Sequence, residues 1–500
     1  MSLQGKKIFI FQQRNWGRTI GHFLAKKLTA EGCVLAAWTM KPSTHKFTKN
    51  QKDVKYEFLI NDDEALNDPV RYLSHEDYSL QEICEALGVP GVWPMASTIR
   101  NYVKSYREKF YYSFRQNVPD EQIVAYIKAV YKYLKRVFEE FQPDLILAPN
   151  FVVLPHIMFN LYGQKRGIPM LAVTDSKVQG INIFTYSYRD DKGPFFERVD
   201  ALNQNLDETI NRERAKKYIA EFRQSFKHPD HTELPVSRGS IWRIVRHELS
   251  PFYQILKWYW KRPENELPAL GPTLDFRPPG IILRDHFARK RYQKFAEKFS
   301  YHPIEKSEKY VYFPLQFQPE AAIDVIAPFF NNQIETARLV AMSLPADYTL
   351  VVKEHPSMVG LRPPSYLEKI ARSPNVKLVD YRIPSEEILR KARLVVNLGN
   401  TILAEAALYK IPGIQLGDLG VTLKLPNVWK HTDMTSLSKK IQEVLEVDLN
   451  TADYERRLEN FVAAAFDAGF DFKYFEVWAK GGDMNILWQI YKKEIEKVLV

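Results

Sequence analysis

The sequence predicts an α/β protein with two Rossmann-like domains that face a cleft, with helical insertions and a C-terminal helical segment. The chain has 500 residues, which is too long for one ordinary hydrophobic core. Short apolar runs alternate with helical patterns near the start, and the same rhythm returns near residue 307. We therefore expect four parts: a Rossmann-like domain with a helical insertion (1–200), a helical or linker region (201–306), a second Rossmann-like domain (307–445) and C-terminal helices (446–500).

The first half begins with a β-loop-α-β pattern and resumes it after a helical insertion. The insertion, 98–141, carries apolar or aromatic residues every three or four positions, which predicts two amphipathic helices, the second capped by Asp120. A later helix is expected to end at Gly167, since glycine commonly follows a helix. The predicted strands are 7–11, 34–40, 143–150 and 168–176.

In the second half, apolar runs again alternate with helical patterns, and the end of the chain reads as helices rich in aromatic residues. Ser385 is the expected N-cap of one helix, with acidic residues in its first turn. The predicted strands are 310–315, 348–353, 374–380, 394–399 and 411–417, and the predicted helices are 334–344, 385–392 and 401–410.

Composition excludes several classes of protein. Hydrophobic residues make up 45% of the chain and charged residues 26%, the balance of a folded soluble protein. Cys33 and Cys84 are the only cysteines, so neither a disulfide framework nor a cysteine-built zinc site is expected. The sequence shows no signal-peptide core and no apolar run of about 18 residues, so we expect a cytoplasmic protein.

The net charge of +10 favours an acidic partner: nucleic acid, an anionic membrane face, or an acidic small molecule or polymer. Simple solubility would also explain it. Residues 241–262 mix aromatic with basic side chains, which suggests docking on the inner face of a membrane. An interdomain helix that buries these rings is the alternative, and nucleic-acid binding is disfavoured because no recognisable module is present. The residues expected at the headgroups are Trp242, Trp258, Trp260, Arg243, Arg246 and Lys257.

Familiar ligand motifs are absent from the sequence. No G-x-G-x-x-G follows the first strand and no G-x-x-x-x-G-K-[ST] occurs, which disfavours a dinucleotide dehydrogenase and a P-loop ATPase. No H-E-x-x-H or dense His/Asp cluster occurs, so we expect no metal and no cofactor. Asp62 and Asp63 look superficially like a metal-binding carboxylate pair, but we interpret them as part of a solvated loop.

Polar residues follow three predicted strands of the second half. Because the carboxyl ends of parallel strands share one edge of a sheet, these residues should meet there. A helix beginning near Ile402 would bind phosphate at its N-terminus, and Glu405, one turn further on, could accept hydrogen bonds from ribose hydroxyls. Ordinary strand-end hydrogen bonds, a snorkelling lysine or simple helix capping would explain each residue singly. The three groups are Gln316, Gln318 and Glu320; Lys353, Glu354 and His355; and Gly399, Asn400 and Thr401.

These segments together resemble a known family. FPLQFQPEAA, VVKEHPSMVG and LVVNLGNTILAEAALYKIPGIQLG are similar to the C-terminal half of capsular polysaccharide synthesis proteins. These are bacterial glycosyltransferases of GT-B architecture that include Kdo transferases. The resemblance covers about 310–420 well and 143–173 loosely. It implies that the second domain binds a nucleotide-sugar and that the first holds the acceptor.

The resemblance also implies roles for single residues. His355, in an H-P pair, would contact the donor phosphate, and Asn400 and Thr401 would contact the same nucleotide. Asn400 departs from the serine that is usual in the family. The remaining donor-binding residues that we expect are Gln316, Gln318, Glu320, Lys353, Ser385 and Glu405. Teichoic-acid glycerophosphotransferases share a K-x-H-P element like 353–356.

The function implied is transfer of a sugar from a nucleotide donor, CMP-Kdo or similar, to a growing capsular or other surface polysaccharide or a lipid-linked glycan. Lys353, His355 and a helix N-terminus would stabilise the departing phosphate without a metal. The acceptor hydroxyl needs a base from the first domain. A CDP-glycerol-type glycerophosphotransferase and a non-catalytic, membrane-associated assembly protein are the alternatives. The expected base is Asp175, with His156 second, and the expected acceptor-binding residues are Arg14, Trp16 and Arg18.

Overall fold

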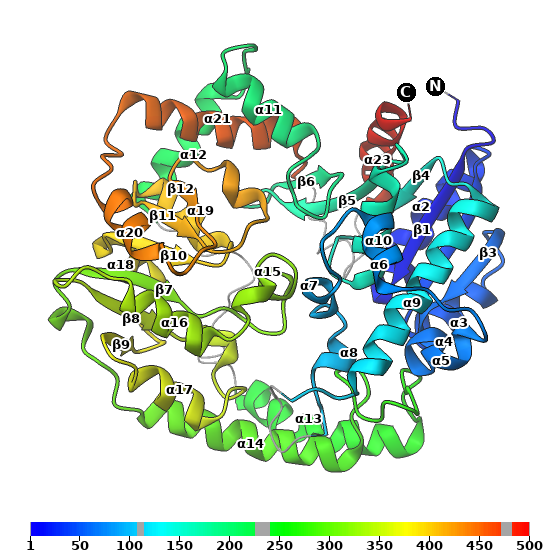
Figure 1. The fold of residues 1–500 in the computed structure, drawn as a ribbon, viewed down its shortest axis with the longest axis horizontal. Helices are drawn as coiled ribbons and strands as arrows, with labels where there is room; N and C mark the ends of the chain where they lie inside the picture. Colours follow the sequence, from blue (N-terminus) through cyan, green and yellow to red (C-terminus); the bar gives the residue numbers. More distant parts are fainter. Residues whose placement is uncertain (1, 108–114, 226–240, 472–482, 500) are drawn as a thin grey trace.

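The computed structural model describes residues 2–107, 115–225, 241–471 and 483–499. Two six-stranded sheets form two α/β halves that stand side by side (Figure 1). The predicted fold class, two Rossmann-like domains, is confirmed. Among the described helices, none is both long and apolar enough to cross a membrane.

The first sheet has the strand order β3-β2-β1-β4-β5-β6, which is the doubly wound Rossmann order. Its strand pairs are parallel except β5–β6, which is antiparallel. Buried apolar side chains fill β1 and β2 on both faces, as expected where helices cover both sides of a sheet. The strands are β1 (Lys7–Gln13), β2 (Val34–Met40), β3 (Tyr56–Asn61), β4 (Leu145–Leu147), β5 (Met170–Asp175) and β6 (Asn182–Thr185).

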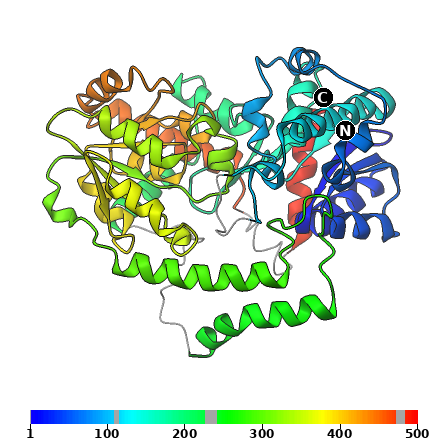
Figure 2. The same ribbon diagram turned by 60° about the horizontal axis from the view of Figure 1, so that its bottom comes forward.

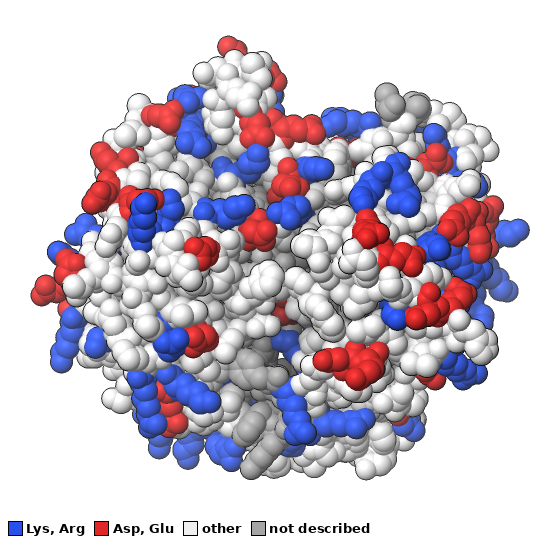
Figure 3. Space-filling model, in the orientation of Figure 1, with Lys and Arg blue, Asp and Glu red and all other residues white. Residues whose placement is uncertain are grey.

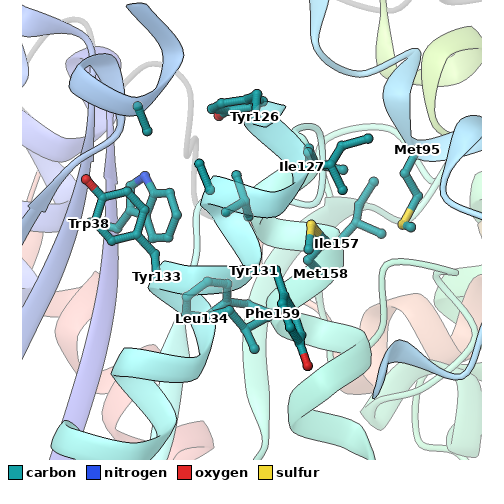
Figure 4. Packing of buried hydrophobic residues seen from close by; sticks show 14 of the residues in the cluster. Trp38, Met95, Tyr126, Ile127, Tyr131, Tyr133, Leu134, Ile157, Met158 and Phe159 are labelled. Carbon is teal, nitrogen blue, oxygen red and sulfur yellow. The ribbon is translucent and has the colours of Figure 1, made fainter. Parts of the chain in front are cut away.

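Helices α9 and α10 cover one face of this sheet, and aromatic rings dominate the contact (Figure 4). The ring of Trp38 on β2 lies 5.0 Å from that of Tyr133 and 5.4 Å from that of Phe159. The helices of this half are α1 (Arg14–Arg18), α2 (Ile20–Ala30), α3 (Pro42–Asn50), α4 (Asp62–Asn67), α5 (Pro69–Leu73), α6 (Leu80–Leu87), α7 (Trp93–Ala96), α8 (Arg100–Val103), α9 (Asp120–Arg136) and α10 (Leu154–Gln164).

The second sheet repeats the same order, β12-β11-β10-β7-β8-β9, and all of its pairs are parallel. Its strands are β7 (Tyr310–Pro314), β8 (Thr349–Lys353), β9 (Val376–Val379), β10 (Leu394–Asn397), β11 (Gly413–Gln415) and β12 (Val428–Lys430). The helices that follow them in the chain are α15 (Ala321–Asp324), α16 (Gln333–Met342), α17 (Pro364–Ala371), α18 (Ser385–Lys391), α19 (Thr401–Leu408) and α20 (Leu437–Leu445).

Helices outside the two sheets tie the halves together. α11 (Pro194–Asn203) and α12 (Arg212–Gln224) pack with α21 (Ala452–Ala468) against the second sheet. The C-terminal helix α23 (Met484–Val498) returns to pack on the first half (Figure 1). α13 (Ile241–Trp260) and α14 (Pro279–Lys298) form a hairpin that runs beneath both halves (Figure 2).

Several local predictions differ from the structure. Within 98–141, the first predicted helix is reduced among the described residues to α8, and residues 108–114 lie outside them. Pro119 and Pro384, rather than Asp120 and Ser385, occupy the N-cap positions. The predicted loop at 12–21 contains the short helix α1. The strands β3, β6 and β12 were not predicted, because none has a long apolar run.

Candidate functional site

A cavity of about 1030 Å³ lies between the two halves and is lined by residues from both (Figure 3 shows the hollow near the middle of the view). Its walls come from the loops that follow β1 to β6 in the first sheet and β7 to β11 in the second. In open α/β sheets the crevice at the carboxyl ends, where the strand order reverses, is the usual ligand site. In this protein, the carboxyl ends of both sheets face the same cavity.

Lys353 ends β8 and turns inward rather than into open solvent. Its Nζ donates to the carbonyl of Ile383 at 2.8 Å and to Oγ of Ser385 at 2.9 Å. Burial lowers the pKa of Lys353 to about 8, although Glu405 and Asp380 partly offset this effect. Lys353 therefore orients the first turn of α18 and adds positive potential to the cavity wall.

Glu405 lies on α19 and is 8% exposed. Burial raises its pKa to about 8, and Lys353 opposes the shift. The two side chains line the same part of the cavity. A carboxyl group whose pKa lies near neutral pH can accept hydrogen bonds from sugar hydroxyls, and in its protonated form it can also donate one.

Glu354 points away from the cavity and forms a buried ion pair. Its Oε1 accepts from Nη1 of Arg362 at 2.6 Å, and both side chains are at most 2% exposed. Arg362 also donates to the carbonyl of Gln316 at 2.6 Å and to Oε1 of Gln318 at 3.3 Å. This pair joins the loop after β7 to the loop after β8. Sequence reasoning missed Arg362, which belongs to no strand-end motif.

Gln316 and Gln318 do not line the cavity, in contrast to the expected donor contacts. Both are 1% exposed. Nε2 of Gln316 donates to the carbonyl of Pro314, and its Oε1 accepts from Nδ2 of Asn400. Gln318 donates to the carbonyl of Asn331. Their side-chain amides form hydrogen bonds within the protein, so these two residues stabilise the loops that line the cavity.

His355 is half-buried and lines the cavity. Its Nδ1 accepts a hydrogen bond from the backbone N–H of Ser357 at 3.2 Å. Since an accepting nitrogen carries no proton, the neutral ring carries its proton on Nε2. Burial, with Arg362 and Lys353 nearby, lowers the pKa of His355 to about 4. At neutral pH the ring is thus an uncharged N–H donor, not the cation that a free histidine can become.

The start of α19 lines the same cavity as His355, and side chains order its first turn. Oδ1 of Asn400 caps the helix by accepting from the N–H of Ile402 at 3.2 Å; from the sequence, either Asn400 or Thr401 could have been the cap. Asn397 holds the preceding turn, because its Oδ1 accepts from the N–H groups of Gly399 and Asn400. Thr401 and Ser385 also line the cavity. A helix N-terminus of this kind favours an anionic ligand.

Gly399 makes the turn before α19 possible. Its φ of +127° suits glycine, and an added Cβ would lie 2.9 Å from Cγ2 of Ile326 and 3.0 Å from Nε2 of Gln415. We expect Gly399→Ala to lower the free energy of unfolding by about 1–3 kcal/mol, measured by urea denaturation. Gly91→Ala, where no atom lies within 4 Å, is the matched control. Equal midpoints for the two variants would contradict this strained-turn account.

Asp62 and Asp63 line the opposite wall, on the first domain. The interpretation of this pair as a solvated loop was wrong, because they begin α4 and are 7% and 6% exposed. Oδ1 of Asp62 accepts from the hydroxyl of Tyr126 at 2.7 Å. Within the described part of the chain, Oδ2 of Asp63 has no hydrogen-bond partner.

Burial is the main reason why both carboxyl groups are hard to ionise. It raises the pKa of Asp62 to about 6 and that of Asp63 to about 7, where the charge of Asp62 adds to the effect. Paired carboxyl groups with shifted pKa values in a cleft are typical of acid–base sites. The sequence signal was available: the two residues follow β3 at its carboxyl end.

The two bases expected from the sequence lie in different environments. Asp175 ends β5 and lines the cavity, but both its oxygens accept hydrogen bonds from Lys177. His156 is fully buried against Phe11 and does not line the cavity. Burial lowers its pKa to about 3. His156 is therefore placed in the core of the first domain, away from any substrate.

The remaining predicted residues divide between the cavity and its surroundings. Arg14, Trp16 and Glu320 line the cavity, although Trp16 is only 2% exposed. Arg18 is exposed and does not line it; its guanidinium donates to Oδ1 of Asn15. Arg14 and Lys41 both bind Asp275, at 3.4 Å and 2.7 Å. Basic side chains thus do gather at the first-domain wall.

Comparisons with known proteins found similar solved structures at low sequence identity. The sequence matches no protein-family model and no curated protein. Among solved structures, the chain is similar to the beta Kdo 2,7 transferase KpsC of Thermosulfurimonas dismutans, with 12% identity, a TM-score of 0.34 and coverage of 67% of this chain and 80% of that one. It is also similar to CalG4, the calicheamicin glycosyltransferase, with 14% identity, a TM-score of 0.27 and coverage of 96% and 99%.

A third similar structure is the UDP-GlcNAc 2-epimerase from Neisseria meningitidis bound to UDP-GlcNAc. Its identity is 11% and its TM-score 0.25, over 95% of this chain and 100% of that one. The functional argument rests on the cavity itself, not on these similarities.

Proposed function

We propose that the protein is a glycosyltransferase that moves a sugar from a nucleotide donor to a hydroxyl group of a glycan. The observation that carries the proposal is the two-sided cavity: N–H donors gather on the second-domain wall and a carboxyl pair faces them from the first. The first set suits a departing phosphate, and the second suits a hydroxyl that must lose a proton. The resemblance of 310–420 to capsular polysaccharide enzymes supports a surface polysaccharide as the product.

On the donor side, the N–H of His355 Nε2, the hydroxyl of Thr401 and the positive end of the α19 dipole would bind the phosphate as its charge develops. Lys353 contributes positive potential from behind, since its Nζ is held by Ile383 and Ser385. Glu405 would bind the ribose hydroxyls. These groups can stabilise the leaving nucleotide by themselves, so the proposed mechanism assigns no role to a metal.

On the acceptor side, we assign the general base to Asp63. One of its oxygens is without a partner among the described residues, and its pKa of about 7 is close to the working pH, which suits a base. Tyr126 holds Asp62 in place beside it. Asp175 remains the second candidate, because it lines the same cavity.

A thermal-shift panel tests the donor site. CMP, CDP, UDP, GDP and their sugars would be added to the wild-type protein, to His355→Ala and to His75→Ala, an exposed histidine away from the cavity. We expect one nucleotide class to stabilise the wild type and His75→Ala, by about 2.7 kcal/mol at a hundredfold excess over Kd. His355→Ala should lose most of that stabilisation. Equal stabilisation of all three proteins would remove His355 from the phosphate site.

The same panel separates the proposal from the two alternatives. Turnover of a nucleotide-sugar with release of its nucleotide supports glycosyl transfer. Turnover of CDP-glycerol alone would instead establish a glycerophosphotransferase. Absence of any nucleotide binding by calorimetry would leave the assembly-protein hypothesis.

A further inference from the structure

We propose that the α13–α14 hairpin is a docking surface for a lipid bilayer with anionic headgroups. The surface is the outer face of α13 from residue 248 onward, together with the exposed side chains of α14. It runs along one edge of the molecule, beneath both halves (Figure 2). This proposal goes beyond sugar transfer and does not depend on it.

An apolar stripe runs along α13. Its members recur at intervals of three and four residues, which places them on one face of the helix. They are Leu249, Phe252, Tyr253, Leu256, Tyr259 and Trp260, with exposed fractions of 57%, 47%, 67%, 69%, 72% and 93%. Phe287 on α14 is 60% exposed as well. A soluble protein rarely presents such a continuous face to water without a partner.

The other side of α13 is already packed. Lys290 of α14 forms an ion pair with Glu248, and Pro251 is buried. Trp258 turns partly inward, and the guanidinium of Arg262 lies over its ring. Trp258 is therefore half-buried, whereas Trp260 is 93% exposed. The side chains of Trp242, Arg243 and Arg246 lie outside the described ones.

Positive charge surrounds the apolar stripe. Lys and Arg side chains gather along the lower edge of Figure 3, over this hairpin. The exposed acidic residues from 249 to 298 are Glu264 and Glu297. The exposed basic residues of the same stretch are Lys257, Lys261, Arg262, Arg289, Lys290, Arg291, Lys294 and Lys298. Each cation near an anionic bilayer contributes about 1 kcal/mol, and buried apolar side chains add to it.

This combination favours a membrane over other occupants. A second copy of the chain, docked through the same face about a two-fold axis, would bring these cations together and repel itself. A nucleic acid would use the cations and the rings but not the exposed aliphatic side chains of Leu249 and Leu256. An interfacial helix uses all three kinds of side chain.

The hairpin is bonded to residues of the cavity wall, so docking of the hairpin would also position the cavity. Asp275, in the loop between α13 and α14, binds Arg14 and Lys41, and both line the cavity. Glu264 and Asn265 bind Lys46 and Ser43 of α3. A docked hairpin would thus hold the first-domain wall near the bilayer, where a lipid-linked acceptor would lie.

Vesicle co-sedimentation tests the proposal. Wild-type protein would be mixed with vesicles of phosphatidylcholine alone, or of equal parts phosphatidylcholine and phosphatidylglycerol, without nucleotide. We expect binding to the anionic vesicles that falls with added salt, and little binding to the neutral ones. The triple variant Leu256→Ser/Tyr259→Ser/Trp260→Ser should bind the anionic vesicles at least roughly tenfold more weakly than the wild type. The matched control is Leu206→Ser/Ile210→Ser, which removes exposed apolar side chains elsewhere and should bind as wild type does.

The unfolding temperature and the response to nucleotide serve as control measurements for the variants. The variants should unfold at the wild-type temperature and keep the wild-type response to nucleotide, so that a failed donor test and a failed docking test are separate outcomes. No binding of wild type to anionic vesicles would overturn the proposal, as would equal binding by the triple variant. Concentration-dependent dimerisation that the triple variant abolishes would assign the face to a second copy instead.

Discussion

Asp63→Asn should lower kcat by about 10²–10⁴-fold, because the amide cannot take the proton of the acceptor hydroxyl. The same substitution should raise the unfolding temperature. Asp63 is 6% exposed and its neutral form is favoured by burial, so an uncharged isostere removes the cost of a buried charge. A residue with only a structural role would not lose activity while gaining stability. Single-turnover rates and thermal unfolding of the same samples measure the two effects.

The pH dependence follows from the raised pKa of Asp63. The base must be ionised, so kcat of the wild type should fall as the pH drops through about 7. The free energy of unfolding has the opposite pH dependence. The pKa of Asp63 is about 7 in the folded protein and 3.8 in the unfolded chain, so its stabilising contribution is complete below pH 3.8 and is lost as the pH rises through about 7. The stability advantage of Asp63→Asn should therefore be largest above pH 7.

Two further variants decide between the candidate bases. Asp62→Asn removes a neighbouring negative charge, so it should move the acidic limb of the pH–rate profile to lower pH without abolishing turnover. Asp175→Asn should change kcat much less than Asp63→Asn. If Asp175→Asn abolishes turnover while Asp63→Asn retains it, the base is Asp175.

Arg362→Met should lower the free energy of unfolding by about 3–5 kcal/mol, since it leaves the carboxyl group of Glu354 buried without its partner. It should also weaken nucleotide binding. Arg362 holds the carbonyl of Gln316, and the amide of Gln316 in turn binds Asn400, so one network orders the loops after β7, β8 and β10. Urea denaturation and the thermal-shift panel measure these two losses.

The control for Arg362 separates the ion pair from its packing. The double variant Glu354→Gln/Arg362→Met removes both charges and should recover part of the lost stability. Arg338→Ala, which breaks an exposed pair with Glu335, should leave the unfolding midpoint almost unchanged. If Arg362→Met unfolds at the wild-type midpoint, the buried pair does not organise the site.

The second domain was predicted more completely than the first, and its residues show why. Its central strands are unbroken apolar runs such as 350–352 and 394–396. The sequence alone shows that such runs are buried. The helix start near Ile402 was predicted with Asn400 or Thr401 as its cap, because capping depends on neighbours within one turn, and the structure shows Asn400. By contrast, β3 has a mixed pattern of buried and partly exposed positions, so neither the strand nor the carboxyl pair after it was recognised.

The sequence by itself determined the class of fold, the two repeats of alternating strand and helix, and the short polar segments that end the strands of the second sheet. These follow from contacts between residues close in the chain. Only the tertiary structure decided which of those side chains face the cavity. Burial of Asp63 depends on α9 and β2, which pack against its helix α4. His355 becomes a neutral donor because it is buried and because Arg362 and Lys353 lie nearby. Desolvation depends on every atom around a group, and most of those atoms come from distant parts of the chain.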